Sequence, residues 1–147
     1  MRICTLDNHT WVCFDEDVIG PWVCSRAGGE YHKGRFKAIG RVKEDGQIMA
    51  GVLYEESNGV NVVCHIAAEG RWANKHFLWL IFHYPIVQLN VNRITTVIEP
   101  QNEKRLEFVK RLGFEFEASL KDSHPLGDMQ IYRMFKRDCR WLEDKRS

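Results

Sequence analysis

The feature that most constrains this chain is a change of hydrophobic period within residues 61–84. Residues 61–68 alternate between two faces, as a β-strand does, with Val63, His65 and Ala67 on one face and Val62, Cys64 and Ile66 on the other. Apolar residues then recur at helical spacing, at Ala73, Phe77, Leu80, Ile81 and Tyr84. The chain is therefore predicted to pass from a strand into a helix through a short loop around Gly70.

Turn signals divide the preceding residues into further strands. Asp45-Gly46 and Asn58-Gly59 are typical of tight turns, because glycine adopts the positive φ that such turns need. We therefore expect residues 38–43, 47–55 and 61–68 to form an antiparallel meander. Earlier signals are weaker, with a short strand predicted at 2–5 and a helix at 18–26 that contains Gly20 and Pro21.

The residues after the helix predict a second strand, helix and hairpin. Pro85 is expected to kink or end the first helix, and the β-branched run in 93–99 predicts a strand that Pro100 stops. A short helix is predicted over 102–112, with Gly113 just beyond its end and with Leu106, Val109 and Leu112 turned inward. Two closing strands, 114–120 and 129–136, flank a loop at 125–127. The fold class is α/β, with a mixed, mostly antiparallel sheet flanked by helices.

Composition limits the classes of function. The 147 residues (17.3 kDa) fit one domain, 1–147, and a net charge of +1 gives no overall field for nucleic acid, which is not an expected partner. The longest uncharged stretch, 76–92, is too polar and short to span a membrane, and the N-terminus has no apolar signal-peptide region. Five irregularly spaced cysteines favour a reducing cytoplasm and predict no disulfide framework and no metal site.

Two segments have the chemistry of an anion site. Gly70 and Arg71 come directly before a helix, whose first N–H groups and partial positive charge suit a pyrophosphate, although a glycine there is more often only a turn. Asn102 and Gly113 bracket the later helix, and each taken alone is explained as a helix cap.

Together these segments resemble the GNAT superfamily of acyl-CoA-dependent N-acyltransferases. The resemblance covers roughly residues 38–137 and rests on the strand and loop ending at Ile66–Trp72, the strand 93–98, Asn102, and Leu112-Gly113-Phe114. The pattern GRW...FLWLIFHYPIVQL..NRIT..I...N....F..RLGF and the terminal RMFKRDCRWL are similar to small acetyltransferases common in phages and their bacterial hosts. That resemblance implies the cytoplasm of a bacterial cell, including a phage-infected host.

The resemblance implies a GNAT-like V-shaped split between parallel strands 61–68 and 93–98, with acetyl-CoA as the acyl donor in it. Residues 37–137 are then the cofactor-binding frame and residues 1–36 the acceptor-binding segment. Pantetheine would pair with the backbone of Ile66, Ala67 and Ala68. The pyrophosphate would lie on the amides of Gly70, Arg71, Trp72, Ala73 and Asn74, with Asn102 also in contact. The 3′-phosphate would meet Arg71, Lys75, Lys104 or Arg105, each of which is equally explained as a solvated helix charge.

The sequence departs from the family pattern at two positions. Trp72 stands where the pyrophosphate loop usually has a glycine-like residue, and Val109 stands where many members have a tyrosine that protonates the leaving thiolate. The branch that acetylates protein N-termini often lacks that tyrosine too, so its absence does not exclude activity.

His65 is the leading candidate for a general base. It lies on the strand that would flank the thioester, and imidazole suits proton transfer near neutral pH. A buried structural histidine is an equal alternative. Glu69 and Glu99 are weaker candidates, and Cys64 is not expected to pair with His65, because adjacent strand residues point to opposite faces.

Two hypotheses for function follow. The first is an N-acetyltransferase (an acyltransferase) that moves an acetyl group from acetyl-CoA to an amine of a small molecule, a protein or a modified nucleobase. The second is a catalytically weak or inactive GNAT-fold phage protein that binds a host or phage protein. The aromatic excess on the 73–84 helix is expected in the core, with a homodimer surface or the acceptor pocket as alternatives.

Overall fold

The computed structural model describes residues 2–5 and 10–142, with only the backbone described for 2–5. Within this part of the chain a single sheet runs in the order β1-β2-β3-β4-β5-β6-β8-β7. Its elements in chain order are β1 (Arg2–Thr5), β2 (Thr10–Cys13), α1 (Glu16–Ala27), β3 (Lys37–Lys43), β4 (Ile48–Tyr54), β5 (Asn61–Ala68), α2 (Lys75–His83), the π-helical turn Tyr84–Gln88, β6 (Arg93–Ile98), α3 (Glu103–Leu112), β7 (Glu115–His124), β8 (Gly127–Phe135) and a 3₁₀ turn at Lys136–Asp138.

Most of the predicted elements are confirmed within a few residues. Strand β2 was not predicted, and it pairs antiparallel with β3 over Thr10–Cys13. Helix α1 begins two residues earlier than predicted, because the Asp15 side chain caps it by accepting from the Asp17 N–H at 3.0 Å. The closing hairpin is longer than predicted, and its strands bond across almost to the turn, with His124 opposite Gly127.

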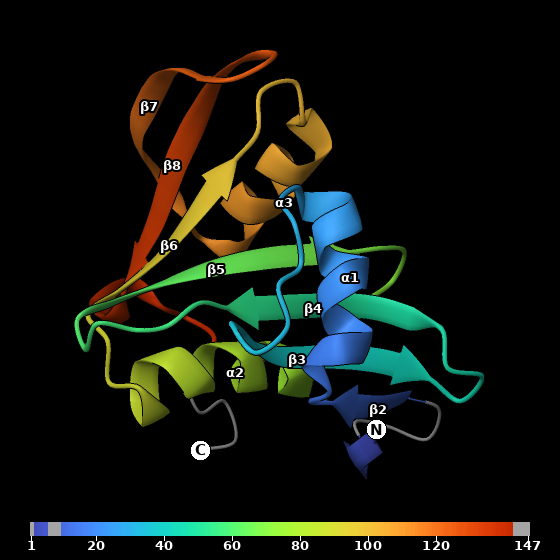
Figure 1. The fold of residues 1–147 in the computed structure, drawn as a ribbon. Helices are drawn as coiled ribbons and strands as arrows, with labels where there is room; N and C mark the ends of the chain where they lie inside the picture. Colours follow the sequence, from blue (N-terminus) through green and yellow to red (C-terminus); the bar gives the residue numbers. More distant parts are fainter. Residues whose placement is uncertain (1, 6–9, 143–147) are drawn as a thin grey trace.

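The predicted split is present between β5 and β6 (Figure 1). These two strands are parallel and pair at only three positions, beginning with Asn61 opposite Arg93 and ending with Val63 opposite Thr95. Beyond Val63 the strands diverge, since β5 continues beside β4 and β6 continues beside β8. The fold class is confirmed as a mixed, mostly antiparallel sheet with one parallel pair that opens into a V.

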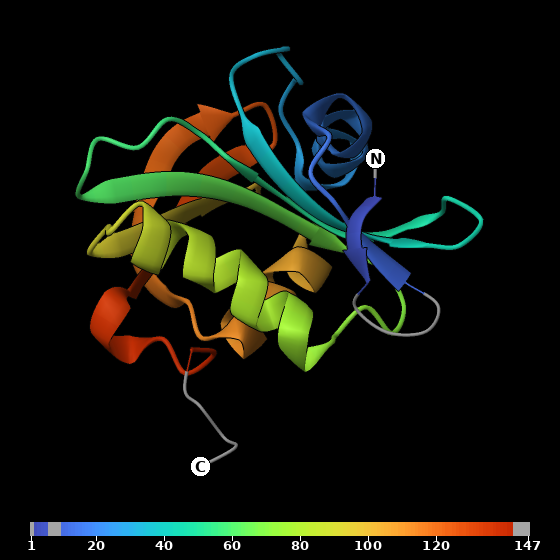
Figure 2. The same cartoon turned by 90° about the horizontal axis from the view of Figure 1, so that it is seen from below.

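The sheet lies between helices, with α1 on one face and α2 and α3 on the other (Figure 2). Buried Ile19 and Val23 of α1 pack with Ala67 of β5 and Leu53 of β4 in the smaller core. The larger core lies on the opposite face, where Phe77, Phe82 and Val109 are among the buried side chains that pack against β4, β5 and β6. The predicted burial of Val109 and Leu112 is confirmed, and Leu106 packs at the edge of this core.

Pro85 changes the helix rather than stopping it outright. The α-helix ends at His83, and the next five residues widen into a π-helical turn in which the Leu89 N–H bonds to the Tyr84 carbonyl at 3.0 Å. Proline has no N–H to donate, and this wider turn accommodates it. None of the helices in the described part of the chain combines the length and the apolarity that a membrane crossing requires.

Gly51 allows α1 to approach the sheet, and it provides a test of this packing. A Cβ added at Gly51 would lie 2.8 Å from Ile19 Cγ2 and 2.8 Å from Val23 Cγ2, closer than packed carbons tolerate. We expect Gly51→Ala to lower the free energy of unfolding by about 1–3 kcal/mol in urea denaturation. The control is Gly51→Ala combined with Val23→Ala, which removes one of the clashing methyl groups. Strictly additive costs would contradict the close approach.

Candidate functional site

A cavity of about 600 Å³ opens between the end of β5, where it has diverged from β6, and helix α3. Among the residues predicted to bind the acyl donor, Arg71, Asn74 and Lys75 do not line the cavity. The others do, namely Ile66, Ala67, Ala68, Gly70, Trp72, Ala73, Asn102, Lys104 and Arg105. The structure therefore brings the end of β5 and the loop that follows it against the start of α3, although α3 begins at Glu103, 35 residues after β5 ends at Ala68.

The charge around this cavity is more positive than that of the whole chain. Four cationic side chains line it against two carboxylates, with Arg26, Lys104, Arg105 and Arg111 opposed by Glu69 and Glu107. One pair is already formed, because Arg26 Nε donates to Glu69 Oε1 at 2.9 Å. The cavity therefore favours an anionic ligand, as local attraction requires in a chain with a net charge of +1.

The backbone N–H and C=O groups of alternate residues of β5 point into the split. The Val63 carbonyl accepts from the Glu55 N–H, and the Glu69 N–H donates to the Met49 carbonyl. The backbone groups of the odd-numbered residues of β5 therefore bond to β4. The N–H and C=O groups of Ile66 and Ala68 therefore face away from β4, toward the cavity. The Ile66 carbonyl already accepts from Arg105 Nε, so an extended amide-bearing chain that enters the split can pair with the Ile66 N–H and with the Ala68 groups as an added strand would.

Arg105 spans the split from α3. Its Nε donates to the Ile66 carbonyl of β5 at 3.2 Å, and its Nη1 donates to the Val97 carbonyl of β6 at 2.7 Å. Its Nη2 donates to Thr96 Oγ1 at 3.2 Å. The side chain is only 6% exposed, and burial lowers the pKa of the guanidinium. Arg105 was predicted at the surface against a 3′-phosphate, and the structure instead directs its charge inward, because the parted strands leave carbonyls that need donors.

The loop between β5 and α2 is held by its own side chains. Gly70 adopts a left-handed conformation with φ of 61°, and the Asn74 side chain caps α2 by accepting from the Phe77 N–H at 3.0 Å. The Trp72 indole packs edge-to-face against Phe108 of α3 with ring centroids 5.0 Å apart. Arg71 is exposed and does not line the cavity. The Asn74 side chain thus has a structural bond, and Trp72 fills space between the loop and α3.

Asn102 lies at the start of α3 and lines the same cavity. Its side chain accepts from the Arg105 N–H at 3.3 Å, so Asn102 is the N-cap of α3, as predicted. Because this cap fixes the first turn of α3, it also fixes where the Arg105 side chain leaves the helix.

His65 lies on the α1 face of β5, beside a carboxylate. Its Nε2 is 2.7 Å from Glu55 Oε2, and its ring meets the edge of Phe36 with centroids 6.1 Å apart. Its side chain is 23% exposed, so it is open to a ligand. The other candidates are already paired, Glu69 with Arg26 and Glu99 with His124 at 3.7 Å.

Glu55 was not singled out from the sequence, although the hairpin register contains the signal. Leu53 pairs with His65, which places Glu55 diagonally across from His65 on the neighbouring strand. Diagonal cross-strand neighbours lie within reach of long side chains.

Residues 28–36 connect α1 to this histidine. Tyr31 donates from its hydroxyl to Asp17 Oδ1 at 2.6 Å and stacks on Phe36 with centroids 6.0 Å apart. Phe36 in turn contacts His65. Gly20 gives the Tyr31 ring its place on α1, because a Cβ there would lie 2.2 Å from the ring.

Cys64 has no part in this site. It is 1% exposed, on the face opposite His65, and burial raises the pKa of its thiol to about 12. The thiol therefore stays protonated at neutral pH and is no nucleophile. Among residues 10–142, no three His, Cys, Asp or Glu side chains gather as ligands for a metal.

The role of Arg105 can be tested by removing its charge. Arg105→Met leaves the Ile66 and Val97 carbonyls without their donors, so we expect the free energy of unfolding to fall by about 2–4 kcal/mol in urea denaturation. The matched control is Lys104→Met, an exposed cation on the same helix turn, for which we expect less than about 0.5 kcal/mol. Equal losses for the two variants would refute the bridging role.

Comparison with known proteins agrees with this geometry. No protein-family model and no curated protein sequence matches the chain. Among solved structures, a spermidine N-acetyltransferase SpeG chimera from Vibrio cholerae and hSSAT superposes with a TM-score of 0.67 at 13% identity, covering 91% of this chain and 99% of that one. The ribosomal-protein-S5-alanine acetyltransferase from Vibrio fischeri gives a TM-score of 0.68 at 14% identity, over 92% and 98% of the two chains. A GNAT-family acetyltransferase from Bacillus anthracis gives 0.55 at 11% identity, over 68% and 66%. The chain has the fold of the GNAT N-acetyltransferases.

Proposed function

We propose that this protein is an N-acetyltransferase that transfers the acetyl group of acetyl-CoA directly to an amine. The observation that carries the proposal is the cavity between the end of β5 and α3, where backbone groups of Ile66 and Ala68 face a cationic lining. A pantetheine arm needs amide partners and a pyrophosphate needs positive charge, and the two occur together here. The GNAT fold supports this assignment.

His65 takes the proton of the acceptor amine in the proposed reaction. The amine must be neutral to attack the thioester carbonyl, and one of its protons must leave as the C–N bond forms. The C–S bond then breaks, and the sulfur departs as a thiolate that takes up a proton from solvent. Backbone N–H groups of β5 that face the split stabilise the charge that develops on the carbonyl oxygen.

Glu55 is the positioning residue for His65. A carboxylate only accepts hydrogen bonds, so the 2.7 Å contact places the imidazole proton on Nε2. Nδ1 is then the nitrogen with a free lone pair, and it is the atom that accepts the proton of the amine.

The second candidate is a GNAT-fold binding protein without efficient catalysis. Trp72 packed against Phe108 and the Asn74 cap at α2 both occupy places in the loop expected to hold pyrophosphate. This candidate predicts little or no release of free thiol from acetyl-CoA in the presence of an amine, so the acetyl-transfer experiment below separates the two.

Acetyl-CoA binding is the first measurement. At a concentration 100-fold above the dissociation constant, the ligand should stabilise the fold by about 2.7 kcal/mol, which raises Tm by roughly 5–11 °C for a chain of this size. Arg111→Glu should weaken binding, because Arg111 lines the cavity, and the matched control Arg71→Glu should weaken it less, because Arg71 does not. No thermal shift at millimolar acetyl-CoA would rule out the proposed function.

Acetyl transfer is measured next as release of free thiol in the presence of an amine. We expect His65→Gln to lower kcat about 100-fold, since general-base catalysis contributes at least that factor. Glu55→Gln should lower kcat by a smaller factor, about 10-fold, because it removes only the group that orients His65. The control is His76→Gln, an exposed histidine on α2. An unchanged rate in His65→Gln would make His65 a structural residue.

A further inference from the structure

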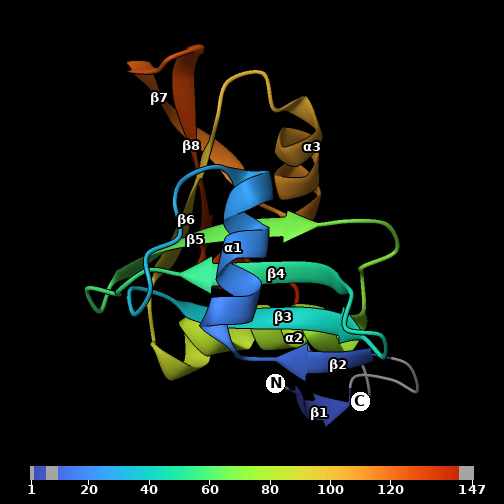
Figure 3. The same ribbon diagram turned by 45° about the vertical axis from the view of Figure 1, so that its right-hand side comes forward.

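Helix α1 covers only part of its face of the sheet. It packs on β3, β4 and β5, and the same face of β6, β8 and β7 extends beyond it (Figure 3). The register places Arg93 and Thr95 of β6 on this face, in line with Asn61 and Val63 of β5, and places Phe135 and Arg133 of β8 beside them. An uncovered sheet face with charged side chains is a surface suited to a polar ligand.

Three guanidinium groups surround one aromatic ring on this face. The central carbons of Arg93, Arg133 and Arg137 lie 6.0, 4.8 and 4.5 Å from the centroid of the Phe135 ring. Like charges this close repel one another unless anions balance them. We call Arg93, Arg133, Arg137 and Phe135 the arginine cluster.

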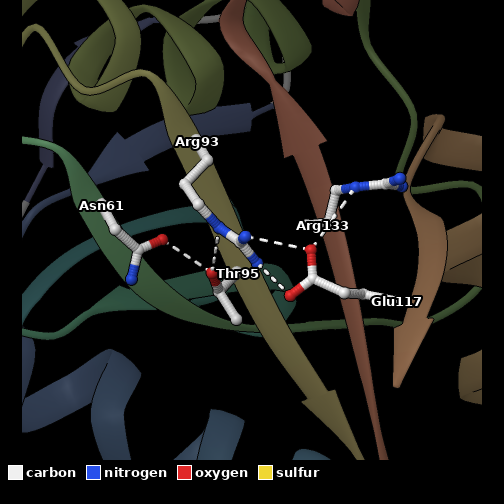
Figure 4. Close-up of polar contacts among 5 residues, drawn as sticks. All are labelled: Asn61, Arg93, Thr95, Glu117 and Arg133. Atoms are coloured by element: carbon white, nitrogen blue, oxygen red, sulfur yellow. Dashed lines mark hydrogen bonds and ion pairs between the residues drawn. The ribbon is translucent and has the colours of Figure 1, made fainter.

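Glu117 is the carboxylate that contacts this arginine cluster, and both of its oxygens accept hydrogen bonds from Arg93 (Figure 4). Arg93 donates from Nη1 and Nη2 to the two oxygens of Glu117, each at 3.0 Å, and from Nε to Thr95 Oγ1 at 3.1 Å. The Thr95 hydroxyl donates in turn to Asn61 Oδ1 at 2.6 Å. The Arg93 fork is therefore satisfied, and the hydrogen bond from Arg93 holds the pKa of Glu117 below its usual range.

Arg133 is the member whose donors are not satisfied. Its Nε is 3.6 Å from Glu117 Oε1, an ion-pair distance, and neither Nε nor Nη1 has a hydrogen-bond partner although both atoms are buried. Buried N–H groups without acceptors are unfavourable. Arg137 is exposed beside the same ring. Positive charge at the exposed Arg137 and at the outer part of Arg133, whose side chain is 21% exposed, is therefore open to an anion.

The arginine cluster lies at a distance from His65 that suits two ends of one ligand. His65 is two residues beyond Val63, which pairs with Thr95, and Thr95 pairs with Arg133. Standard strand rise and spacing put the Cα atoms of His65 and Arg133 on the same face at least roughly 12 Å apart, because β5 and β6 diverge beyond Val63. This separation exceeds that between the amino and carboxyl groups of a single amino acid.

We infer that the arginine cluster is the subsite for an anionic group, a carboxylate or a phosphate, on the amine that the proposed reaction acetylates. This inference rests on the proposed function. The acceptor carries its anion several bonds from the amine, as a peptide does when its second or third residue is acidic. Arg133 and Arg137 bind the anion, and His65 receives the proton at the other end.

The experiment uses the full chain and a set of short peptides that share one sequence and differ at the third residue, which is Asp, phosphoserine, Asn or Lys. Thiol release should give kcat/KM at least 10-fold higher for the Asp or phosphoserine peptide than for the Asn peptide, with the Lys peptide lowest. The comparison of Asp with phosphoserine distinguishes the two sources of the anion. Equal kcat/KM for the four peptides would overturn the inference.

Substitutions in the arginine cluster test which residues produce the preference for anionic peptides. Arg137→Gln and Arg133→Gln should abolish the preference for the anionic peptides, while Lys110→Gln on α3 should leave that preference intact. Arg133→Lys, which keeps the positive charge, replaces Arg133→Gln in this experiment if the latter fails to fold. Arg137 is exposed, so Arg137→Gln is compatible with folding. A preference that survives both the Arg133 and Arg137 changes would overturn the inference.

A binding measurement separates this inference from the proposed function. Peptide titration without acetyl-CoA, followed by NMR of the arginine Nε–H signals, should show tighter binding of the Asp peptide than of the Asn peptide, with the Arg133 signal shifting. That result without any thiol release would refute the proposed reaction and keep the anion subsite. Thiol release without the binding preference would keep the reaction and refute the subsite.

Discussion

The buried guanidinium of Arg105 is the contact on which the split depends. Two parallel strands that part after three paired residues leave carbonyls without their sheet partners, and Arg105 donates to one carbonyl from each strand. Its planar fork matches this task, because it presents several donors in a fixed geometry. The Asn102 cap and the buried face of α3 hold the arginine in place, so the shape of the cavity follows from the packing of one helix.

The two faces of the sheet have different surroundings around that split. The cavity with its cationic lining is formed mainly by the end of β5, the loop after it and α3, and in the proposed reaction it holds the acyl donor. On the α1 face, His65 and Glu55 lie beside a polar surface that suits an acceptor. The two ligands of the proposed reaction would therefore approach from opposite faces and meet where β5 and β6 separate. An acyl transfer by direct attack needs such an arrangement, because both reactants must be bound at once.

Local sequence predicted most of the fold, and long-range contacts account for what it did not. Residues 61–68 and 102–112 were predicted because alternation and helix caps are local signals. Strand β2 is short and gains its stability from pairing with β3, which no local pattern records. Arg105 was predicted outside for the same reason, since a charged residue on a helix is usually solvated and only the parted strands bring it inward. The His65–Glu55 contact depends on hairpin register, which fixes diagonal neighbours.

The chain of contacts from α1 through Tyr31 and Phe36 to His65 affects how this protein can change. Residues 28–36 lie where the acceptor is expected, yet the same residues support the proposed base. A substitution that reshapes this segment for a different amine will also move the imidazole. In the proposed reaction, acceptor choice and turnover would therefore change together. New specificity would arise more readily from the side chains of β6 and β8, which can vary without disturbing the histidine.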